Sequence, residues 1–211
     1  TMPDKTEAAK YVDELSPAAQ IIGAVNTIVN DDGRLTGYIT DGEGFVHNLK
    51  DHGVDIKGKK ITVAGGGGAA TAIQVQCALD GAREITIFNI KDAFFERTLQ
   101  TAEKIRKAVP GIVVNVYDIA DTAKMTEEIT SSDIFANATI VGMKPMDDQS
   151  VVKDLSAFRP GLVVCDAVYN PAETKLLREA KEAGCTCIGG KGMLLWQGVA
   201  AFRLYTGMDM P

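Results

Sequence analysis

The sequence predicts an α/β protein built on a doubly wound, mostly parallel Rossmann-type sheet, preceded by the remnant of a second α/β lobe. Two observations support this prediction. From residue 60 onward, β-branched apolar segments alternate with helical segments. A run of four glycines, residues 65–68, joins the first of these strands to a helix. We expect each strand–helix–strand crossover to be right-handed.

The glycine run has the context of a dinucleotide-binding loop. A strand over 60–63 leads through it into a helix over 69–79, and the next strand ends near Asp92. Gly65 permits the tight turn, and Gly67 lets backbone N–H groups approach a pyrophosphate. The helix start adds amides and a partial positive charge for the anion. A structural turn, or a loop for S-adenosylmethionine or FAD, remains open on this motif alone.

The rest of the alternation follows in order along the chain. We expect strands over 84–88, 112–117, 133–138, 162–168 and 186–188, and helices over 93–108, 121–130, 171–183 and from Met193.

The segment before the glycine loop has a different pattern. Residues 6–15 place Ala8, Ala9, Tyr11, Val12 and Leu15 on one face of an expected helix, which Ser16-Pro17 ends. Strands over 24–29 and 34–39 flank Asn30-Asp-Asp-Gly33, a strong hairpin signal. A helix over 42–50 follows. A helix and a hairpin before a complete nucleotide-binding fold indicate the end of another lobe.

Composition narrows the classes of function. The 211 residues carry a net charge of −6 without a long Lys/Arg cluster, which argues against nucleic acid. The chain has no apolar run near the roughly 20 residues that span a bilayer. Four cysteines lie in apolar or strand-like segments, and no second Cys or His pair completes a metal site around Cys185 and Cys187. Free thiols indicate a reducing compartment, and we therefore expect a cytoplasmic protein without a metal.

Several motifs together resemble the shikimate/quinate dehydrogenase family, most closely its quinate/shikimate branch, whose members use NAD as well as NADP. They occur in the family's order across the whole chain, although the family's first strands and helices have no counterpart here. The motifs are Thr1-Met-Pro-Asp-Lys5, Gly23-Ala-Val-Asn-Thr27, Gly37-Tyr-Ile-Thr-Asp-Gly42, Gly65-x-Gly-Gly-Ala69, Asn137-Ala-Thr-x-x-Gly-Met143, Val168-Tyr-Asn-Pro171 with Thr174, and Gly192-Met-Leu-Leu-Trp-Gln-Gly198.

The resemblance implies an oxidoreductase that interconverts shikimate or quinate with its 3-dehydro form by hydride transfer. Lys5 matches the family's catalytic lysine and Asp41 its partner aspartate. Polar positions that contact the substrate correspond to Thr1, Asn26, Tyr169 and Gln197. If the resemblance is set aside, Lys5 has the alternative interpretation of a solvated lysine at a helix start, and Asp41 that of a cap for the helix that follows. A non-catalytic nucleotide- or metabolite-binding relative is the alternative, with another Rossmann enzyme such as a methyltransferase as a third.

The residues after the expected strand over 84–88 favour NAD as the cofactor, with NADP as the alternative. A carboxylate at Asp92 suits the free 2′-hydroxyl of NAD and repels a phosphate. Ile90 stands where NADP-preferring relatives carry arginine, whereas Lys91 is able to pair with a phosphate. The expected cofactor contacts are Gly65, Gly67, Gly68, Ala69, Asn89, Lys91, Asp92, Thr139, Met143, Val168 and Gly190.

The resemblance also implies a division of the chain. Residues 1–41 correspond to part of the substrate-binding lobe, 42–190 to the NAD(P)-binding domain, and 191–211 to a helix that returns toward the substrate lobe. A small molecule is the expected partner, and a homodimer remains open. Ile39, Asp4 and Lys191 depart from the family's pattern, at positions beside the expected substrate or cofactor.

Overall fold

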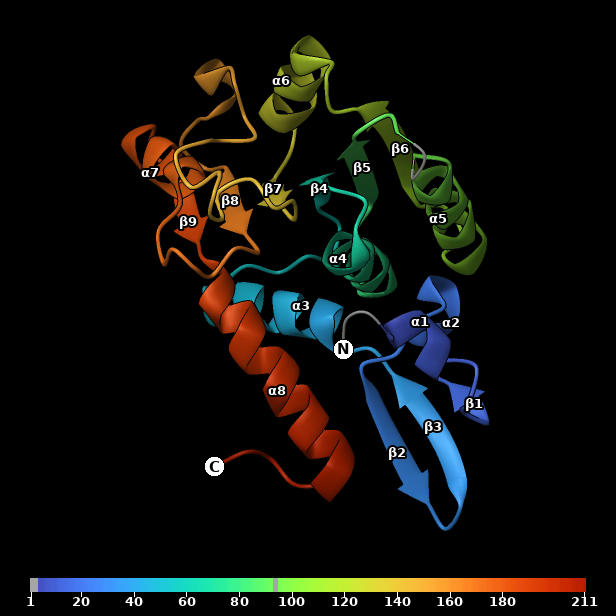
Figure 1. The fold of residues 1–211 in the computed structure, drawn as a ribbon. Helices are drawn as coiled ribbons and strands as arrows, with labels where there is room; N and C mark the ends of the chain where they lie inside the picture. The colour runs from blue at the N-terminus through green and yellow to red at the C-terminus, as the bar shows by residue number, and fades with distance from the viewer. Residues whose placement is uncertain (1–3, 93–94) are drawn as a thin grey trace.

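The computed structural model describes residues 4–92 and 95–211, which form a large and a small sheet with helices around them (Figure 1). The large sheet has six strands in the order β6-β5-β4-β7-β8-β9, and every pairing is parallel. Its strands are β4 (Lys60–Ala64), β5 (Glu84–Asn89), β6 (Val113–Asp118), β7 (Ile134–Asn137), β8 (Val163–Asp166) and β9 (Thr186–Ile188).

This order confirms the doubly wound sheet. The chain moves outward from β4 to β6, returns to pair β7 with the other side of β4, and then moves outward again to β9. The reversal creates a switch point between β4 and β7, where the carboxyl ends of the strands leave room for a ligand. The register brings Ala64, Asn137 and Asp166 side by side at this edge.

Helices cover both faces of the large sheet. Side chains alternate along each strand, so Ile85 and Ile87 pack in one apolar cluster and Phe88 packs in the other. The first cluster includes α4 and α5, and the second includes α6, α7 and the short η1. Their bounds are α4 (Gly68–Leu79), α5 (Phe95–Ala108), α6 (Thr122–Thr130), α7 (Lys175–Glu182) and the 3-10 helix η1 (Leu155–Ala157). The predicted helix over 171–183 thus starts later, at Lys175, where Thr174 caps it.

The small sheet lies in the amino-terminal segment. β2 (Thr27–Asp31) and β3 (Arg34–Tyr38) form the predicted antiparallel hairpin, and β1 (Glu14–Leu15) pairs in parallel with β3. Asp32 and Gly33 take positive φ values of 48° and 94° at its turn.

The prediction of one helix over 6–15 was wrong. Helix α1 (Lys5–Ala8) is a single turn, and the chain then extends into β1, leaving Tyr11 72% exposed. Val12 and Leu15 pack instead over Gly37, where an added Cβ would lie 3.2 and 3.1 Å from their methyl carbons. Pairing with β3 therefore determines the backbone conformation of this segment, although the spacing of its apolar residues is typical of a helix. A second helix that the sequence analysis missed, α2 (Pro17–Ile22), begins at the Ser16 cap.

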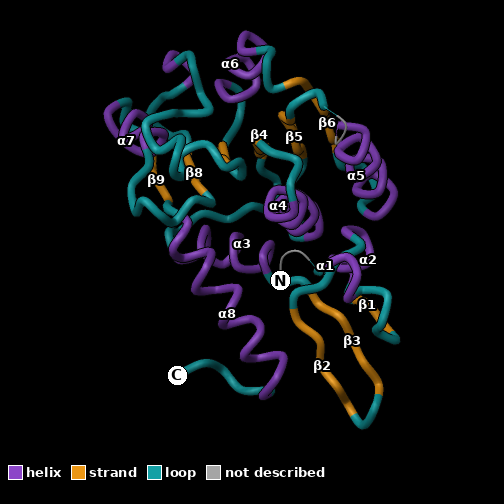
Figure 2. The backbone as a smooth tube through the Cα atoms, viewed as in Figure 1, coloured by secondary structure: helices purple, strands orange, loops and turns teal. Residues whose placement is uncertain are grey.

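Two helices join the small sheet to the large one. Helix α3 (Asp41–Asp51) packs against α4 on one side and α8 (Gly190–Thr206) on the other (Figure 2). A Cβ on Gly42 would lie 2.3 Å from the carbonyl oxygen of Ala72, and one on Gly44 would lie 2.6 Å from that of Met193. Glycine is therefore required at both positions for the backbones to meet. Within the described ranges, no helix combines the length and apolarity needed to cross a membrane.

Candidate active site

Lys5 and Asp41 form an ion pair between the amino-terminal segment and the start of α3. Lys5 Nζ lies 2.8 Å from Asp41 Oδ2, and the two side chains are 21% and 12% exposed. The backbone of Lys5 is fixed as well, because its carbonyl accepts a hydrogen bond from Val25 N at 2.9 Å. The pair is thus held in place, and its partly exposed side chains remain accessible to a ligand.

Asn26 completes this group, just before β2 begins. Its Nδ2 donates to Asp41 Oδ2 at 3.0 Å and to Thr40 Oγ1 at 3.1 Å, while its Oδ1 accepts from Thr40 N at 3.1 Å. Thr27 Oγ1 also donates to Asn26 Oδ1 at 3.0 Å. The amide therefore ties the hairpin to the first turn of α3 and orients the Asp41 carboxylate toward Lys5.

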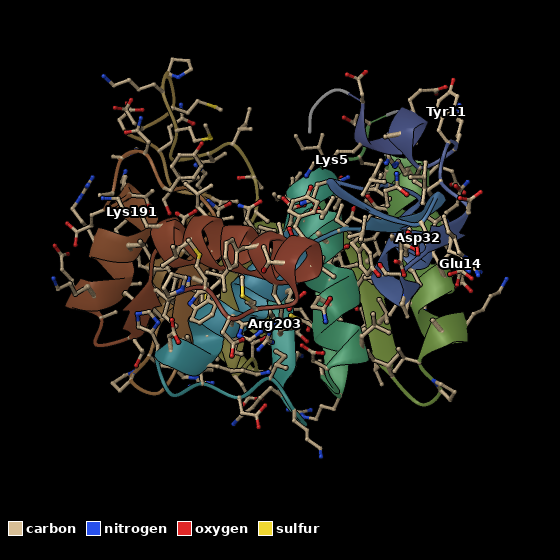
Figure 3. All side chains as sticks on the ribbon, turned by 90° about the horizontal axis from the view of Figure 1, so that it is seen from below. Lys5, Tyr11, Glu14, Asp32, Lys191 and Arg203 are labelled. Carbon is tan, nitrogen blue, oxygen red and sulfur yellow. The ribbon has the colours of Figure 1, made fainter. Side chains whose placement is uncertain are left out.

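The other expected substrate contacts lie on separate segments of the chain. Gln197 is half-buried on α8, and its backbone N lies 2.7 Å from the position of a Cβ on Gly44, which places it against α3. Tyr169 is 48% exposed in the loop after β8. Thr1 falls outside the described residues. Lys191, at the first turn of α8, lies well apart from Lys5 (Figure 3).

The glycine loop has the shape that a pyrophosphate requires. Gly65 has a φ of +123°, and a Cβ there would lie 2.7 Å from the carbonyl oxygen of Ala138. Its own carbonyl accepts a hydrogen bond at 2.9 Å from Nε2 of the buried Gln74. A Cβ on Gly67 or Gly68 would meet nothing within 4 Å, so the space before the α4 amino terminus is open. These residues fit a bound dinucleotide.

A cavity of about 540 Å³ opens in front of this loop. It is bounded by the loops after β5 and β6 and by the segment that follows β7. Gly65, Gly67, Asn89 and Thr139 of the expected cofactor residues line it. Gly68, Ala69, Lys91, Asp92, Met143, Val168 and Gly190 are not among its lining residues.

Sequence reasoning missed part of this cavity wall. Ile119, Thr122, Gln149, Ser150 and Lys153 line the cavity but belong to no motif quoted above. Their position in the chain could have identified them, because the loops that follow parallel strands form the ligand crevice. Asn89, expected only as a cofactor contact, also has a structural role: its Nδ2 donates to Thr98 Oγ1 at 3.0 Å. That bond fixes the end of β5 against α5.

A buried polar cluster lies beside the cavity, at the ends of β7 and β8. Asn137 and Asp166 are 1% and 2% exposed, and Asn137 Nδ2 donates to Asp166 Oδ1 at 3.0 Å. Val168 N donates to the same oxygen at 3.0 Å, and Thr174 Oγ1 donates to Oδ2 at 2.6 Å. Burial raises the pKa of Asp166 from 3.8 to about 6, although these hydrogen bonds lower it. No motif in the sequence marks this carboxylate.

The start of α8 packs on the loop after β8. A Cβ on Gly190 would lie 2.4 Å from the carbonyl oxygen of Ala167 and 2.8 Å from that of Val168. Asn48 Nδ2, from α3, donates to Gly189 O at 3.0 Å. The predicted positions Val168 and Gly190 therefore lie together at this end of the sheet.

Family models match both ends of the chain. The Shikimate dehydrogenase substrate binding domain matches residues 1–28, and the Shikimate 5'-dehydrogenase C-terminal domain matches residues 190–211. The quinate/shikimate dehydrogenase of Escherichia coli O139:H28 is 51% identical over 211 residues, which are all of this chain and 73% of that protein.

Solved structures give the same result in three dimensions. Shikimate 5-dehydrogenase from Listeria monocytogenes, in complex with shikimate and NAD, matches with a TM-score of 0.97 and 51% identity over 100% of this chain and 73% of that one. Shikimate 5-dehydrogenase from Thermus thermophilus, in complex with NADP(H) and shikimate, gives 0.81 and 34% over 100% and 73%. The order of motifs, the fold and these similarities show that the chain belongs to the quinate/shikimate dehydrogenase family.

Proposed function

We propose that this chain is an NAD(P)-dependent oxidoreductase that interconverts shikimate or quinate with the 3-dehydro form. The observation that supports this most directly is the Lys5–Asp41 pair, oriented by Asn26, in a chain of this family. A hydroxyl-to-carbonyl redox reaction needs a positioned acid–base group and a site for the dinucleotide, and the chain has a candidate for each.

Lys5 is assigned the proton transfer. In the direction of reduction its ammonium donates a proton to the carbonyl oxygen, and in the direction of oxidation its amine accepts the hydroxyl proton. Asp41 Oδ2, 2.8 Å from Nζ, holds the ammonium in place and hydrogen-bonds the reacting hydroxyl. Asn26, with Thr1, Tyr169 and Gln197, is assigned to the other polar groups of the substrate, since a missing hydroxyl would leave a buried partner unpaired.

The glycine loop and the 540 Å³ cavity are assigned to the dinucleotide. When bound there, the nicotinamide ring accepts or supplies the hydride. Gly67, Gly68 and Ala69 would hold the pyrophosphate at the start of α4. Asn89, Lys91 and Asp92 would face the adenosine ribose, with Asp92 favouring NAD over NADP. Thr139, Met143, Val168 and Gly190 would lie toward the nicotinamide.

Replacing Lys5 by alanine tests the proposal. NADH formation is measured with shikimate and with quinate, and NAD affinity is measured separately by fluorescence. We expect turnover to fall by at least about 10²-fold, the usual contribution of a positioned acid or base, with NAD affinity nearly unchanged. Lys10→Ala is the matched control, because that lysine is exposed and pairs only with its neighbour Glu7 among the interactions described.

Two results would contradict the assignment. A Lys5→Ala variant that keeps wild-type turnover would show that Lys5 is not the acid–base group. A wild-type chain that binds NAD but turns over neither substrate would favour the non-catalytic relative. The cytoplasmic location, the homodimer and the division at residues 41 and 190 remain predictions, for which cell fractionation, light scattering and limited proteolysis are the direct measurements.

A further inference from the structure

We propose that Asp166 is a positioning residue for hydride transfer, which holds the loops after β7 and β8 in the spacing that the cofactor needs. The inference rests on the proposed function. Asp166 ends β8, beside Asn137 at the end of β7. It is 2% exposed and takes no part in the proton transfer assigned to Lys5.

The carboxylate joins three separate segments of chain. Its Oδ1 accepts from Asn137 Nδ2 on β7 and from Val168 N in the loop after β8, both at 3.0 Å. Its Oδ2 accepts at 2.6 Å from Oγ1 of Thr174, the residue that caps α7. A buried acceptor with three donors on three segments fixes their relative position, because moving any one leaves a buried polar group unpaired.

From Asn137 the contacts lead into the cavity wall. Asn137 Oδ1 accepts from Thr139 N at 3.1 Å and from Thr139 Oγ1 at 2.7 Å, while its Nδ2 also donates to Val141 O at 3.0 Å. Thr139 and Val141 both line the cavity. The shape of this wall therefore depends on an amide whose orientation Asp166 sets.

From Val168 the contacts lead toward the substrate group. The carbonyl of Val168 lies 2.8 Å from the position of a Cβ on Gly190, so the loop after β8 and the first turn of α8 are in backbone contact. Further along α8, Gln197 lies against α3, which begins at Asp41. One buried carboxylate is thus linked by packing to both halves of the site.

A carboxylate is a costly group for this purpose. Burial raises the pKa of Asp166 to about 6, so holding the ionised form near neutral pH opposes folding. The ionised carboxylate, however, accepts from all three donors at once and so ties their segments together. Perturbed carboxylates of this kind concentrate at functional sites.

The test compares Asp166→Ala and Asp166→Asn. Alanine leaves Asn137, Val168 and Thr174 without their acceptor. We expect the NAD dissociation constant to rise about 10-fold or more and kcat/KM to fall roughly 10²-fold, the cost of a displacement near 1 Å, with the shikimate KM at saturating NAD changed less than about 3-fold. Asparagine retains Oδ1 and donates to Thr174 Oγ1, so we expect it to restore both constants to within about 3-fold.

Asp133→Ala is the matched control. Asp133 lies just before β7, at the opposite edge of the sheet, and accepts from Lys60 N at 2.8 Å. The Asp133→Ala variant should be less stable than the wild type but should bind NAD with wild-type affinity. Equal losses in both alanine variants, wild-type affinity in Asp166→Ala, or an asparagine variant as impaired as alanine would overturn the proposal. If Asp166→Ala does not fold, Thr174→Val removes the Oδ2 donor together with the α7 cap but leaves both Oδ1 donors in place; NAD affinity weakened about 3-fold or more supports the proposal, and wild-type affinity refutes it.

Discussion

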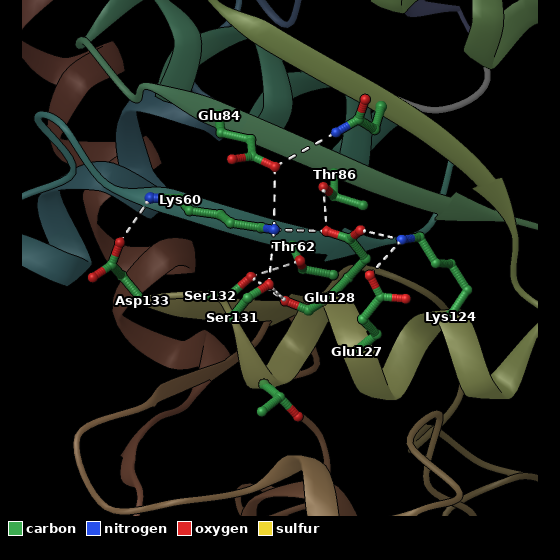
Figure 4. A network of polar contacts seen from close by, with 12 residues as sticks. Lys60, Thr62, Glu84, Thr86, Lys124, Glu127, Glu128, Ser131, Ser132 and Asp133 are labelled. Atoms are coloured by element: carbon green, nitrogen blue, oxygen red, sulfur yellow. Dashed lines mark hydrogen bonds and ion pairs between the residues drawn. The ribbon is translucent and has the colours of Figure 1, made fainter.

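Replacing Lys60 by methionine is expected to destabilise the fold by about 2–3 kcal/mol while leaving NAD affinity unchanged. Lys60 begins β4, at the edge of the sheet away from the cofactor cavity, and is 7% exposed. Its Nζ lies 2.7 Å from Glu128 Oε2, 3.1 Å from Glu84 Oε1 and 2.9 Å from Ser131 Oγ (Figure 4). Methionine fills a similar volume but removes the charge.

The size of the expected stability loss depends on the partners that Glu128 retains in the variant. Breaking a buried ion pair by removing one partner costs about 3–5 kcal/mol, because the other charge is left uncompensated. Glu128 retains Lys124 Nζ at 2.9 Å from Oε1 and Thr86 Oγ1 at 3.1 Å from Oε2, which offsets part of that loss. At about 2–4 °C per kcal/mol for a chain of this size, the melting temperature should fall by about 4–12 °C.

The effect should depend on pH. Burial raises the pKa of Glu128, but hydrogen bonds from Lys60 and Lys124 outweigh burial and lower it below 4.5. A carboxylate whose folded pKa is lowered adds stability that is present above its unfolded pKa and is lost as pH falls through the folded value. The difference between wild type and Lys60→Met should therefore be greatest near neutral pH and shrink below pH 4.5.

Urea unfolding at pH 7 and pH 4 measures both effects. Lys59→Met is the control, because the adjacent Lys59 side chain is 44% exposed and lies 3.5 Å from Asp133; it should cost less than about 1 kcal/mol. A Lys60→Met variant within about 0.5 kcal/mol of wild type, or one whose deficit grows on acidification, would refute the reasoning.

Three further outcomes are expected. Asp92→Ala should lower NAD affinity more than NADP affinity, measured by fluorescence titration, whereas equal losses would leave Asp92 without a role in selectivity. Gly66→Ala should lower NAD affinity about 10-fold or more, because its Cβ would lie 2.4 Å from Asn89 Nδ2 and 2.5 Å from Thr98 Oγ1; unchanged affinity would show that the loop adapts. Asp166→Asn should gain up to about 3 kcal/mol of stability relative to wild type as pH rises from 4 to 7, because the pKa of Asp166 is raised from 3.8 to about 6 on folding and the wild type therefore loses stability as pH rises between these two values; a constant difference in urea unfolding would contradict this.

Local sequence was sufficient for the large sheet. The central strands β4, β7 and β8 are short, mostly apolar runs that parallel pairing buries almost completely, so composition and position agree. The hairpin around Asp32 and Gly33 was equally readable, since its turn requires residues that tolerate positive φ. In these segments local preference and tertiary packing favour the same structure.

The amino-terminal segment and the polar cluster were not readable in this way. Val12 and Leu15 have helical spacing, yet Glu14–Leu15 pairs with β3 and both apolar side chains pack over Gly37, which leaves space for them. Asp166 follows an apolar strand and gives no local sign that Asn137, 29 positions earlier, lies beside it. Such contacts depend on strand register, which becomes known only once the sheet order is fixed.

The glycines of α3 have a consequence for how this site can change over generations. Because Gly42 and Gly44 place the main chain of α3 against Ala72 of α4 and Met193 of α8, the distances between these helices are set by backbone contact at both positions. Residues of the cavity wall that take no part in these backbone contacts can vary without disturbing them. In a library of variants selected for new hydroxy acids, we expect replacements to accumulate around the cavity and to be absent at these two positions.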